Sequence, residues 1–222
     1  MTFHIVTIFP HIFDSYFNEG IIRRATKVKK NFVIEIYDLR NYTEDKHRTV
    51  DDTPFGGGPG MVLKVEPIFR CLQEIKAKIG DETSKVILFS AKGDLFNQEK
   101  AQQWSTNVQH LILICGRYEG VDERVAMYLA DEEISIGNYV LTGGEIPAMA
   151  VVDAVSRLIP GVLGNPDSLV SETHCIEQAA SDYPVFTRPE IFNGWEVPEV
   201  LRSGDHKKIG QWRDKQRKKL KH

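Results

Sequence analysis

Two segments decide the fold: HLILICGRYEGVDER, residues 110–124, and EISIGNYVLTGGE, residues 133–145. In each, a short apolar run leads directly into glycine, at Gly116 in the first and at Gly137 in the second, where Gly143 and Gly144 follow. Near-continuous apolar runs are typical of parallel strands buried on both faces, and ligands of α/β proteins bind at the carboxyl ends of such strands. The two loops are therefore predicted to line one cleft, with backbone groups suited to an adenine or amino-acid cofactor.

The first 160 residues alternate β-branched runs with helix-like segments, which predicts an α/β fold. Strands are expected at 3–8, 32–37, 85–90, 110–115 and 133–136. Helices are expected at 10–17, 21–29, 66–78, 97–106, 121–130 and 145–159. Because most of the strands are near-continuous apolar runs, we expect a parallel sheet with crossover helices.

Two long segments lack a periodic pattern and are expected to be irregular: 40–61, which ends in a run of glycines, and 161–188. Loops of this length in a compact protein are usually functional or disordered. After Pro189 the pattern becomes short helical segments, PEIFNG, VPEVLRSG and DHKKIGQWRDKQRKKL. We therefore predict an α/β domain over 1–162, a flexible linker over 163–188 and a small helical domain over 189–222.

The charge of the chain is unevenly distributed. The formal net charge is −3, yet residues 206–222 hold eight Lys or Arg side chains and one Asp. A polyanion such as RNA would attract this basic segment, although a solvated terminal helix has the same composition. Three widely spaced cysteines without a CxxC pair argue against a disulfide framework and a zinc knuckle. No apolar run approaches the roughly 20 residues of a membrane span, so we expect a cytoplasmic protein without membrane contact.

Single motifs leave the chemistry open. The glycines of 56–60, GGGPG, let a backbone approach a ligand closely, but a tight structural turn has the same composition. No Gly-Lys-Ser/Thr follows them, which disfavours a phosphate-binding nucleotide hydrolase. Arg117 and Glu119 are the charged groups of the first strand-end loop, where they serve either a ligand or a surface ion pair.

Six strings stand in order along the chain: TVDDTPFGGGPGM, GRYEGVDER, SIGNYVLTGGEIPAM, DAVSRLIPGVLG, YPVFTRPE and VPEVLRSGDHKKIGQWR. In order and spacing they resemble the bacterial tRNA (guanine-N1)-methyltransferase family. This resemblance implies a SPOUT-type parallel sheet with a C-terminal trefoil knot, a flexible linker and a small helical domain that binds tRNA, working as a homodimer. It also implies methyl transfer from S-adenosylmethionine to N1 of guanosine at position 37 of tRNA, next to the anticodon. The alternative is a non-catalytic SPOUT-type RNA-binding protein.

By matching position, the resemblance implies that S-adenosylmethionine binds in the loops that follow three of the strands. Ala91 and Asn138 stand where the family usually has proline and aspartate, and both changes leave backbone contacts possible. The implied cofactor-binding residues are Leu88, Phe89, Ser90, Gly93, Gly116, Tyr118, Glu119, Gly120, Ile136, Gly137, Asn138, Tyr139, Val140, Leu141, Gly143 and Gly144.

N1 of guanine carries a proton, so its methylation needs a base and a cation that stabilises charge on O6. The resemblance assigns the cation to Arg157, which could also pair with Asp153 on the same predicted helix. The family's catalytic aspartate lies in the linker. Aligning SETHC to the family's acidic string puts Glu172 there at the cost of a short insertion, whereas counting without a gap puts His174 there, and Asp182 is the third candidate.

Two further expectations come from the resemblance. The family suggests that magnesium takes part, although no residue is assigned to a metal. Relative to the family's pattern the C-terminal segment is shortened by about one or two helices, while Trp212, Arg213, Lys215 and Arg217 remain and could hold tRNA phosphates.

Overall fold

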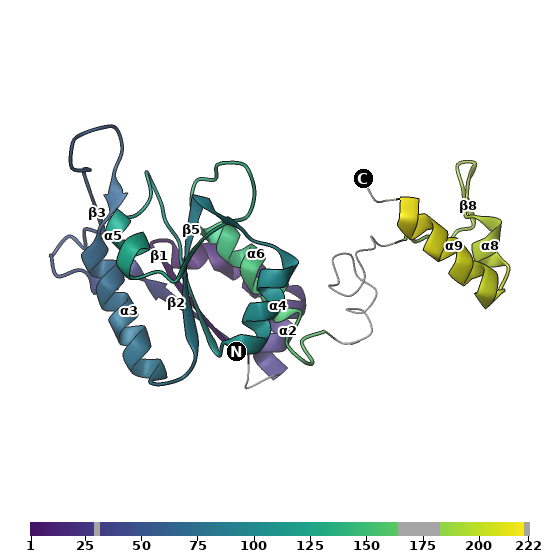
Figure 1. Cartoon of the computed structure of the whole chain (residues 1–222), viewed down its shortest axis with the longest axis horizontal. Helices are drawn as coiled ribbons and strands as arrows, with labels where there is room; N and C mark the ends of the chain where they lie inside the picture. Colours follow the sequence, from purple (N-terminus) through teal and green to yellow (C-terminus); the bar gives the residue numbers. More distant parts are fainter. Residues whose placement is uncertain (29–31, 164–182, 220–222) are drawn as a thin grey trace. The chain divides into compact units, whose positions relative to one another are not determined.

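The computed structural model describes residues 1–28, 32–163 and 183–219. The chain divides into two compact units, Met1–Gly164 and Asn165–His222, and each is described by itself (Figure 1). Most of the predicted linker falls on residues 164–182, outside the described residues, so its bounds stay predictions. Within the described parts, no helix is long and apolar enough to cross a membrane.

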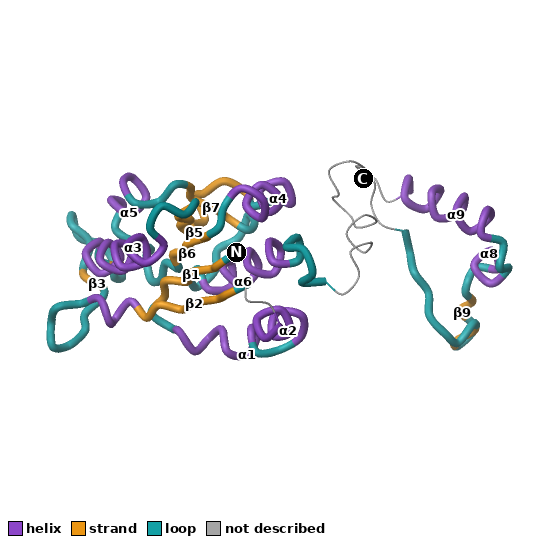
Figure 2. Tube along the Cα trace, turned by 90° about the horizontal axis from the view of Figure 1, so that it is seen from below, coloured by secondary structure: helices purple, strands orange, loops and turns teal. Residues whose placement is uncertain are grey.

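A five-stranded sheet forms the centre of the first unit. Its order is β2-β1-β6-β5-β7, which can be followed along the labels in Figure 2. The strands are β1 (Thr2–Thr7), β2 (Val33–Asp38), β5 (Ser84–Leu95), β6 (His110–Ile114) and β7 (Glu132–Ser135). Every strand pair in this sheet is parallel. The predicted parallel sheet is therefore confirmed, and each of its five strands was expected from the sequence.

Strand β5 is longer than its predicted range of 85–90, because it runs on to Leu95. Its register against β7 shifts between Phe89 and Asp94, so that Ile134 pairs with both. The residues between them leave the ladder as a bulge. Gly93 lies in this bulge, where a Cβ atom would come within 2.5 Å of the backbone of β7. Only glycine lets the two strands approach this closely.

Helices cover both faces of the sheet (Figure 1). The helices of the first unit are η1 (Pro10–Phe13), α1 (Asp14–Phe17), α2 (Gly20–Val28), η2 (Leu39–Tyr42), α3 (Val65–Ile79), α4 (Gln98–Asn107), α5 (Glu123–Tyr128) and α6 (Glu145–Ser156). Side-chain caps begin three of them. Asp38 accepts a hydrogen bond from the N–H of Arg40, Asn97 from that of Lys100, and Asp122 from that of Arg124. The six predicted helices are confirmed, although the first is partly 3₁₀ and the last ends at Ser156 rather than at 159.

Two apolar clusters attach the helices to the sheet. Side chains alternate between its faces along each strand. In β6, Leu111 and Leu113 belong to the cluster beneath α4 and α6, whereas Ile112 and Ile114 belong to the cluster beneath α3 and α5. Because both faces are covered, residues 111–114 of β6 are all apolar, which explains this continuous apolar run of the sequence.

The segment 40–61 is more regular than the sequence predicts. β3 (Asp51–Asp52) and β4 (Val62–Leu63) form a short antiparallel ladder. Between them the carbonyl of Pro54 accepts a hydrogen bond from the N–H of Gly57. The N–H of Glu119 donates to the carbonyl of Met61, at 3.0 Å, and thereby fixes the end of this segment to the loop after β6.

The described part of the second unit, residues 183–219, contains a hairpin and two helices. β8 (Ile191–Phe192) and β9 (Trp195–Glu196) are antiparallel and are joined by Asn193 and Gly194, which both have positive φ. The helical prediction for PEIFNG is therefore wrong, and the physical reason is its Asn-Gly pair, which favours a two-residue hairpin turn. The helices α8 (Glu199–Arg202) and α9 (His206–Lys219) follow at the predicted positions.

Candidate functional site

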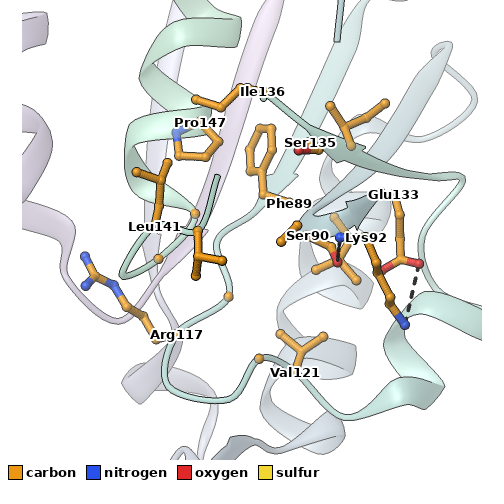
Figure 3. A pocket seen from close by; sticks show the side chains of 18 of the residues that line it. Phe89, Ser90, Lys92, Arg117, Val121, Glu133, Ser135, Ile136, Leu141 and Pro147 are labelled. Carbon is orange, nitrogen blue, oxygen red and sulfur yellow. Dashed lines mark hydrogen bonds and ion pairs between the residues drawn. The ribbon is translucent and has the colours of Figure 1, made fainter. Parts of the chain in front are cut away.

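A cavity of about 530 Å³ lies where the loops after β5, β6 and β7 meet (Figure 3). This volume is within the usual range of small-molecule sites, about 300–1,000 Å³. The walls combine backbone of glycine-containing loops with side chains from the end of β5, from both loops and from the start of α6. The structure therefore brings together the two loops that the sequence predicts to share a cleft and the end of β5, which the resemblance also implies.

Most of the predicted cofactor-binding residues line this cavity. They are Leu88, Phe89, Ser90, Gly116, Tyr118, Glu119, Gly120, Ile136, Gly137, Tyr139, Val140, Leu141, Gly143 and Gly144. Gly93 and Asn138 are not among the lining residues: Gly93 lies against β7, and Asn138 is exposed. The shared location is an observation, and the binding of a cofactor by these residues stays a prediction.

The glycines of the second loop are required by close approaches. A Cβ atom on Gly144 would come within 2.6 Å of the Cα atom of Cys115. The N–H of Gly144 donates to the carbonyl of Gly116 at 2.9 Å. A Cβ atom on Gly143 would overlap the side chain of Arg117. These contacts fix the loop after β7 against the loop after β6, and they leave the backbone of both accessible from the cavity.

A buried polar network lies behind this wall of the cavity. Glu145, the first residue of α6, is fully buried. Its two carboxylate oxygens accept hydrogen bonds of 2.8 Å from the Thr7 hydroxyl and from Nε of Arg117. Nη1 of Arg117 also donates to the carbonyl of Thr142 at 3.2 Å, and its guanidinium lies 4.8 Å from the centre of the Phe9 ring. The network joins β1, both loops and α6.

Sequence reasoning weighed Arg117 only as a ligand-binding group or a surface ion pair, and it missed Glu145 and Thr7. A partial signal was present, since the two residues carry opposite charges and belong to loops that were expected to meet. The same environment affects Cys115, whose thiol pKa is raised well above its usual value by burial and also by the Glu145 charge. This thiol therefore stays protonated and is not a nucleophile.

An exposed lysine with two carboxylates forms another part of the cavity wall that the sequence analysis missed. Nζ of Lys92 lies 2.8 Å from the carboxylate of Glu123. It also lies 3.8 Å from the carboxylate of Glu133 (Figure 3). The hydrogen bond to Glu123 raises the pKa of Lys92. One carboxylate oxygen of Glu133 is buried without a partner among the described residues. These groups give one end of the cavity a polar character.

Of the predicted catalytic residues, only Arg157 lies within the described part of the chain. It is half-buried and is the C-cap residue of α6. Burial raises the pKa of the Tyr16 hydroxyl, and the nearby carboxylate of Asp153, the alternative partner of Arg157, raises it further. The three candidates for the base, Glu172, His174 and Asp182, lie outside the described residues. Among those that are described, no group of three His, Cys, Asp or Glu side chains is suited to a metal ion.

Comparison with known proteins gives one consistent result. The family model for "tRNA (Guanine-1)-methyltransferase TrmD" matches residues 1–221. A tRNA (guanine-N(1)-)-methyltransferase of Dictyoglomus turgidum is 55% identical over 212 residues, which cover 96% of this chain and 83% of the relative. The enzyme of the same name from Clostridioides difficile is 47% identical over 214 residues, which cover 96% of this chain and 90% of the relative. The chain therefore belongs to the tRNA (guanine-1)-methyltransferase TrmD family.

Proposed function

We propose that this protein transfers a methyl group from S-adenosylmethionine to N1 of guanosine 37 in tRNA, next to the anticodon. The family match over residues 1–221 carries the proposal, because it includes both the cavity and the basic helix α9. The relatives bear the name of an enzyme with this base specificity. That name favours catalysis over the alternative, a non-catalytic SPOUT-type RNA-binding protein.

The cavity fits S-adenosylmethionine in size and in the chemistry of its walls. Ile136, Leu141 and Pro147 make one side apolar, which suits an adenine ring, while Ser90 and Lys92 lie on a polar side (Figure 3). Backbone groups of the two glycine loops supply donors and acceptors between them. When bound, the cofactor supplies a methyl group on a positively charged sulfonium, which is a good leaving group.

The chain's own residues prepare the guanine. Its N1 proton must leave before N1 becomes a good nucleophile, and we assign its removal to Glu172, with His174 and then Asp182 as the other candidates. We assign Arg157 to the negative charge that develops on O6. Holding the tRNA in the productive geometry supplies much of the remaining rate enhancement.

The position of Arg157 supports a homodimer. The start of α6 lines the cavity at Pro147, whereas Arg157 caps the other end of this helix, about 18 Å from its first residue at roughly 1.5 Å per residue. One arginine side chain does not span this distance. A second copy would bring its own Arg157 to the cavity. Three exposed side chains offer an apolar surface for such a contact: Phe9, which precedes η1, Ile12 on η1, and Ile146 at the start of α6.

The remaining features are proposed on family resemblance. They are the trefoil knot, the linker over 163–188, the helical tRNA-binding domain over 189–222 and a location in the cytoplasm, where bacterial tRNA is modified. A role for magnesium is proposed without assigned residues.

Methylation of two matched tRNA transcripts tests the proposed function. The transcripts differ only in having guanosine or adenosine at position 37, and the full chain is incubated with each and with cofactor carrying a labelled methyl group. We expect incorporation into the guanosine transcript only. Parallel reactions with magnesium and with a chelator test whether methyl transfer requires magnesium. If the chain binds S-adenosylhomocysteine but labels neither transcript at any pH, the non-catalytic alternative is correct.

A further inference from the structure

Three charged side chains gather at one end of the cavity, and none of them was predicted from the sequence to bind the cofactor. Lys92 lies in the bulge of β5, Glu123 begins α5 and Glu133 belongs to β7. All three line the cavity. Its apolar side, at Leu141 and Pro147, lies across from Lys92 and Glu133 (Figure 3). The two sides of the cavity therefore suit different parts of a ligand.

Among the described residues that line the cavity, two carry a positive charge, Lys92 and Arg117. The Arg117 side chain is largely buried, and its guanidinium donates to the carboxylate of Glu145 and to the carbonyl of Thr142. Lys92 is exposed and pairs with the exposed Glu123. An exposed ion pair contributes little stability, and the flexible stem of a lysine lets its ammonium group exchange partners. Lys92 is therefore the cation that an anionic group of a ligand can recruit.

Glu133 supplies a negative charge at the same end. Its side chain is mostly buried, and its nearest oxygen lies 3.8 Å from Nζ of Lys92, too far for a hydrogen bond. The other carboxylate oxygen is buried without a hydrogen-bond partner among the described residues. Leaving a buried charged oxygen unpaired costs free energy. A cationic group of a ligand beside Glu133 would offset this cost.

The amino-acid part of S-adenosylmethionine has the complementary charges. It carries an α-carboxylate and an α-ammonium group on one carbon atom, so a lysine beside a carboxylate matches both. The apolar side of the cavity suits the adenine ring, which leaves the polar end for the amino-acid part. Hydrogen bonds in which both partners are charged are shorter and stronger than neutral ones.

We propose that Lys92 binds the α-carboxylate of S-adenosylmethionine and that Glu133 binds its α-ammonium group. The assignment rests on the proposed function, because it divides the proposed cofactor site between its two ends. It makes Lys92 and Glu133 specificity residues, since together they distinguish the complete cofactor from adenosine derivatives that lack the amino-acid part.

Calorimetric binding of three ligands to the full chain tests the role of Lys92. The ligands are S-adenosylhomocysteine, the same molecule without its α-carboxylate, and the same molecule without its α-amino group. Lys92→Met keeps an unbranched side chain and removes the charge. We expect it to bind S-adenosylhomocysteine about ten-fold more weakly, the lower end of the range for a hydrogen bond to a charged group, because Lys92 is exposed. Its affinity for the ligand without the α-carboxylate should change by less than about two-fold.

Glu133→Gln gives the reciprocal test, because it keeps the shape of the side chain and removes its charge. We expect about ten-fold weaker binding of S-adenosylhomocysteine and little change for the ligand without the α-amino group. Lys76→Met is the matched control, since this exposed lysine of α3 does not line the cavity. It should bind all three ligands as the unaltered chain does. Thermal unfolding verifies that each variant is folded.

Unchanged affinity of Lys92→Met for S-adenosylhomocysteine would overturn the assignment of Lys92. An equal loss for this ligand and for the one without the α-carboxylate would also overturn it, because the effect would then not depend on the group that Lys92 binds. The same comparison with the ligand without the α-amino group decides for Glu133. The proposed function fails separately, if the unaltered chain binds the three ligands in this pattern but transfers no methyl group to tRNA. An unaltered chain that does not bind S-adenosylhomocysteine would overturn both.

Discussion

The carboxylate of Glu145 accepts a hydrogen bond of 2.8 Å from Nε of Arg117, although 28 positions separate the two residues. Glu145 begins α6, and Arg117 belongs to the loop after β6 that lines the cavity. The other carboxylate oxygen accepts from Thr7 on β1. The pair thus fixes one wall of the cavity to the sheet, and the shape of the proposed cofactor site depends on it.

Replacement of Glu145 should destabilise the protein strongly. Glu145→Ala leaves the largely buried Arg117 without its counter-charge, and breaking a buried ion pair costs about 3–5 kcal/mol. Urea unfolding should therefore give a free energy of unfolding for Glu145→Ala that is at least about 3 kcal/mol lower than that of the unaltered protein. The matched control is Glu123→Ala, which breaks the exposed pair with Lys92 and should cost less than about 1 kcal/mol. Equal losses in the two variants would contradict this role of Glu145.

Gly144 should not tolerate a side chain. In Gly144→Ala the new methyl group would lie 2.6 Å from the backbone of Cys115, so the two loops must separate. We expect a loss of about 1–3 kcal/mol in unfolding free energy, as for other overpacked positions, and weaker binding of S-adenosylhomocysteine in calorimetry. Gly210→Ala in α9 is the control, since no atom lies within 4 Å of its new methyl group and alanine favours a helix. Unchanged cofactor binding by a folded Gly144→Ala protein would mean that the contact does not shape the cavity.

Stability should fall in mild acid because of His4. This side chain is buried, with Nδ1 3.1 Å from the Tyr37 hydroxyl and Nε2 2.9 Å from His110. Burial lowers its pKa to about 4, although the Glu35 charge opposes the shift. The unfolded chain, with a His4 pKa near 6.5, therefore binds more protons between these pH values. The contribution of neutral His4 to the free energy of unfolding is complete above about pH 6.5. As the pH falls from 6.5 towards 4, the free energy of unfolding decreases by up to about 3 kcal/mol.

Urea unfolding at about pH 7 and pH 5 measures this effect. His4→Asn should reduce the difference between the two pH values, whereas His11→Asn, which alters a fully exposed histidine, should leave it unchanged. If the stability of both variants depends on pH in the same way, a group other than His4 causes the loss of stability in mild acid.

The base can be identified by comparing three variants under identical conditions. Glu172→Gln, His174→Gln and Asp182→Asn each remove one candidate, and the loss of a true base should lower the rate of methyl transfer about 100-fold or more. We expect this for Glu172→Gln, with S-adenosylhomocysteine binding retained. A small effect of Glu172→Gln beside a large effect of either other variant would reassign the base.

The fold was largely predictable because both faces of its sheet are covered. Strand β6 reads as an unbroken apolar run for this reason, and the glycines directly after it indicated a strand-end loop. The ladder of β3 and β4 was missed because two residues per strand are too few for a periodic pattern. The hairpin at Asn193 and Gly194 carries a local turn signal, but its two-residue strands are too short to show a strand pattern.

The candidate site was only partly predictable. Glycines that follow strands identify a cavity from local sequence, and Gly116 and Gly144 do line it. The pairing of Glu145 with Arg117, and of Lys92 with Glu123, depends on which loops meet in space. Sequence distance carries no information about such contacts. Gly93 does not line the cavity, and it permits the close approach of two strands, a use of glycine that local sequence does not distinguish from ligand binding. Its predicted contact with the cofactor stays a prediction.

Mapping the product tests the central claim most directly. A tRNA with guanosine at position 37 is incubated with the full chain and S-adenosylmethionine, digested, and analysed by mass spectrometry for the position and chemical form of the methylated nucleoside. The account predicts 1-methylguanosine at position 37, and its loss with Arg157→Ala while cofactor binding persists. A methyl group at another nucleotide or on another guanine atom, or none in a protein that binds the cofactor, would contradict it.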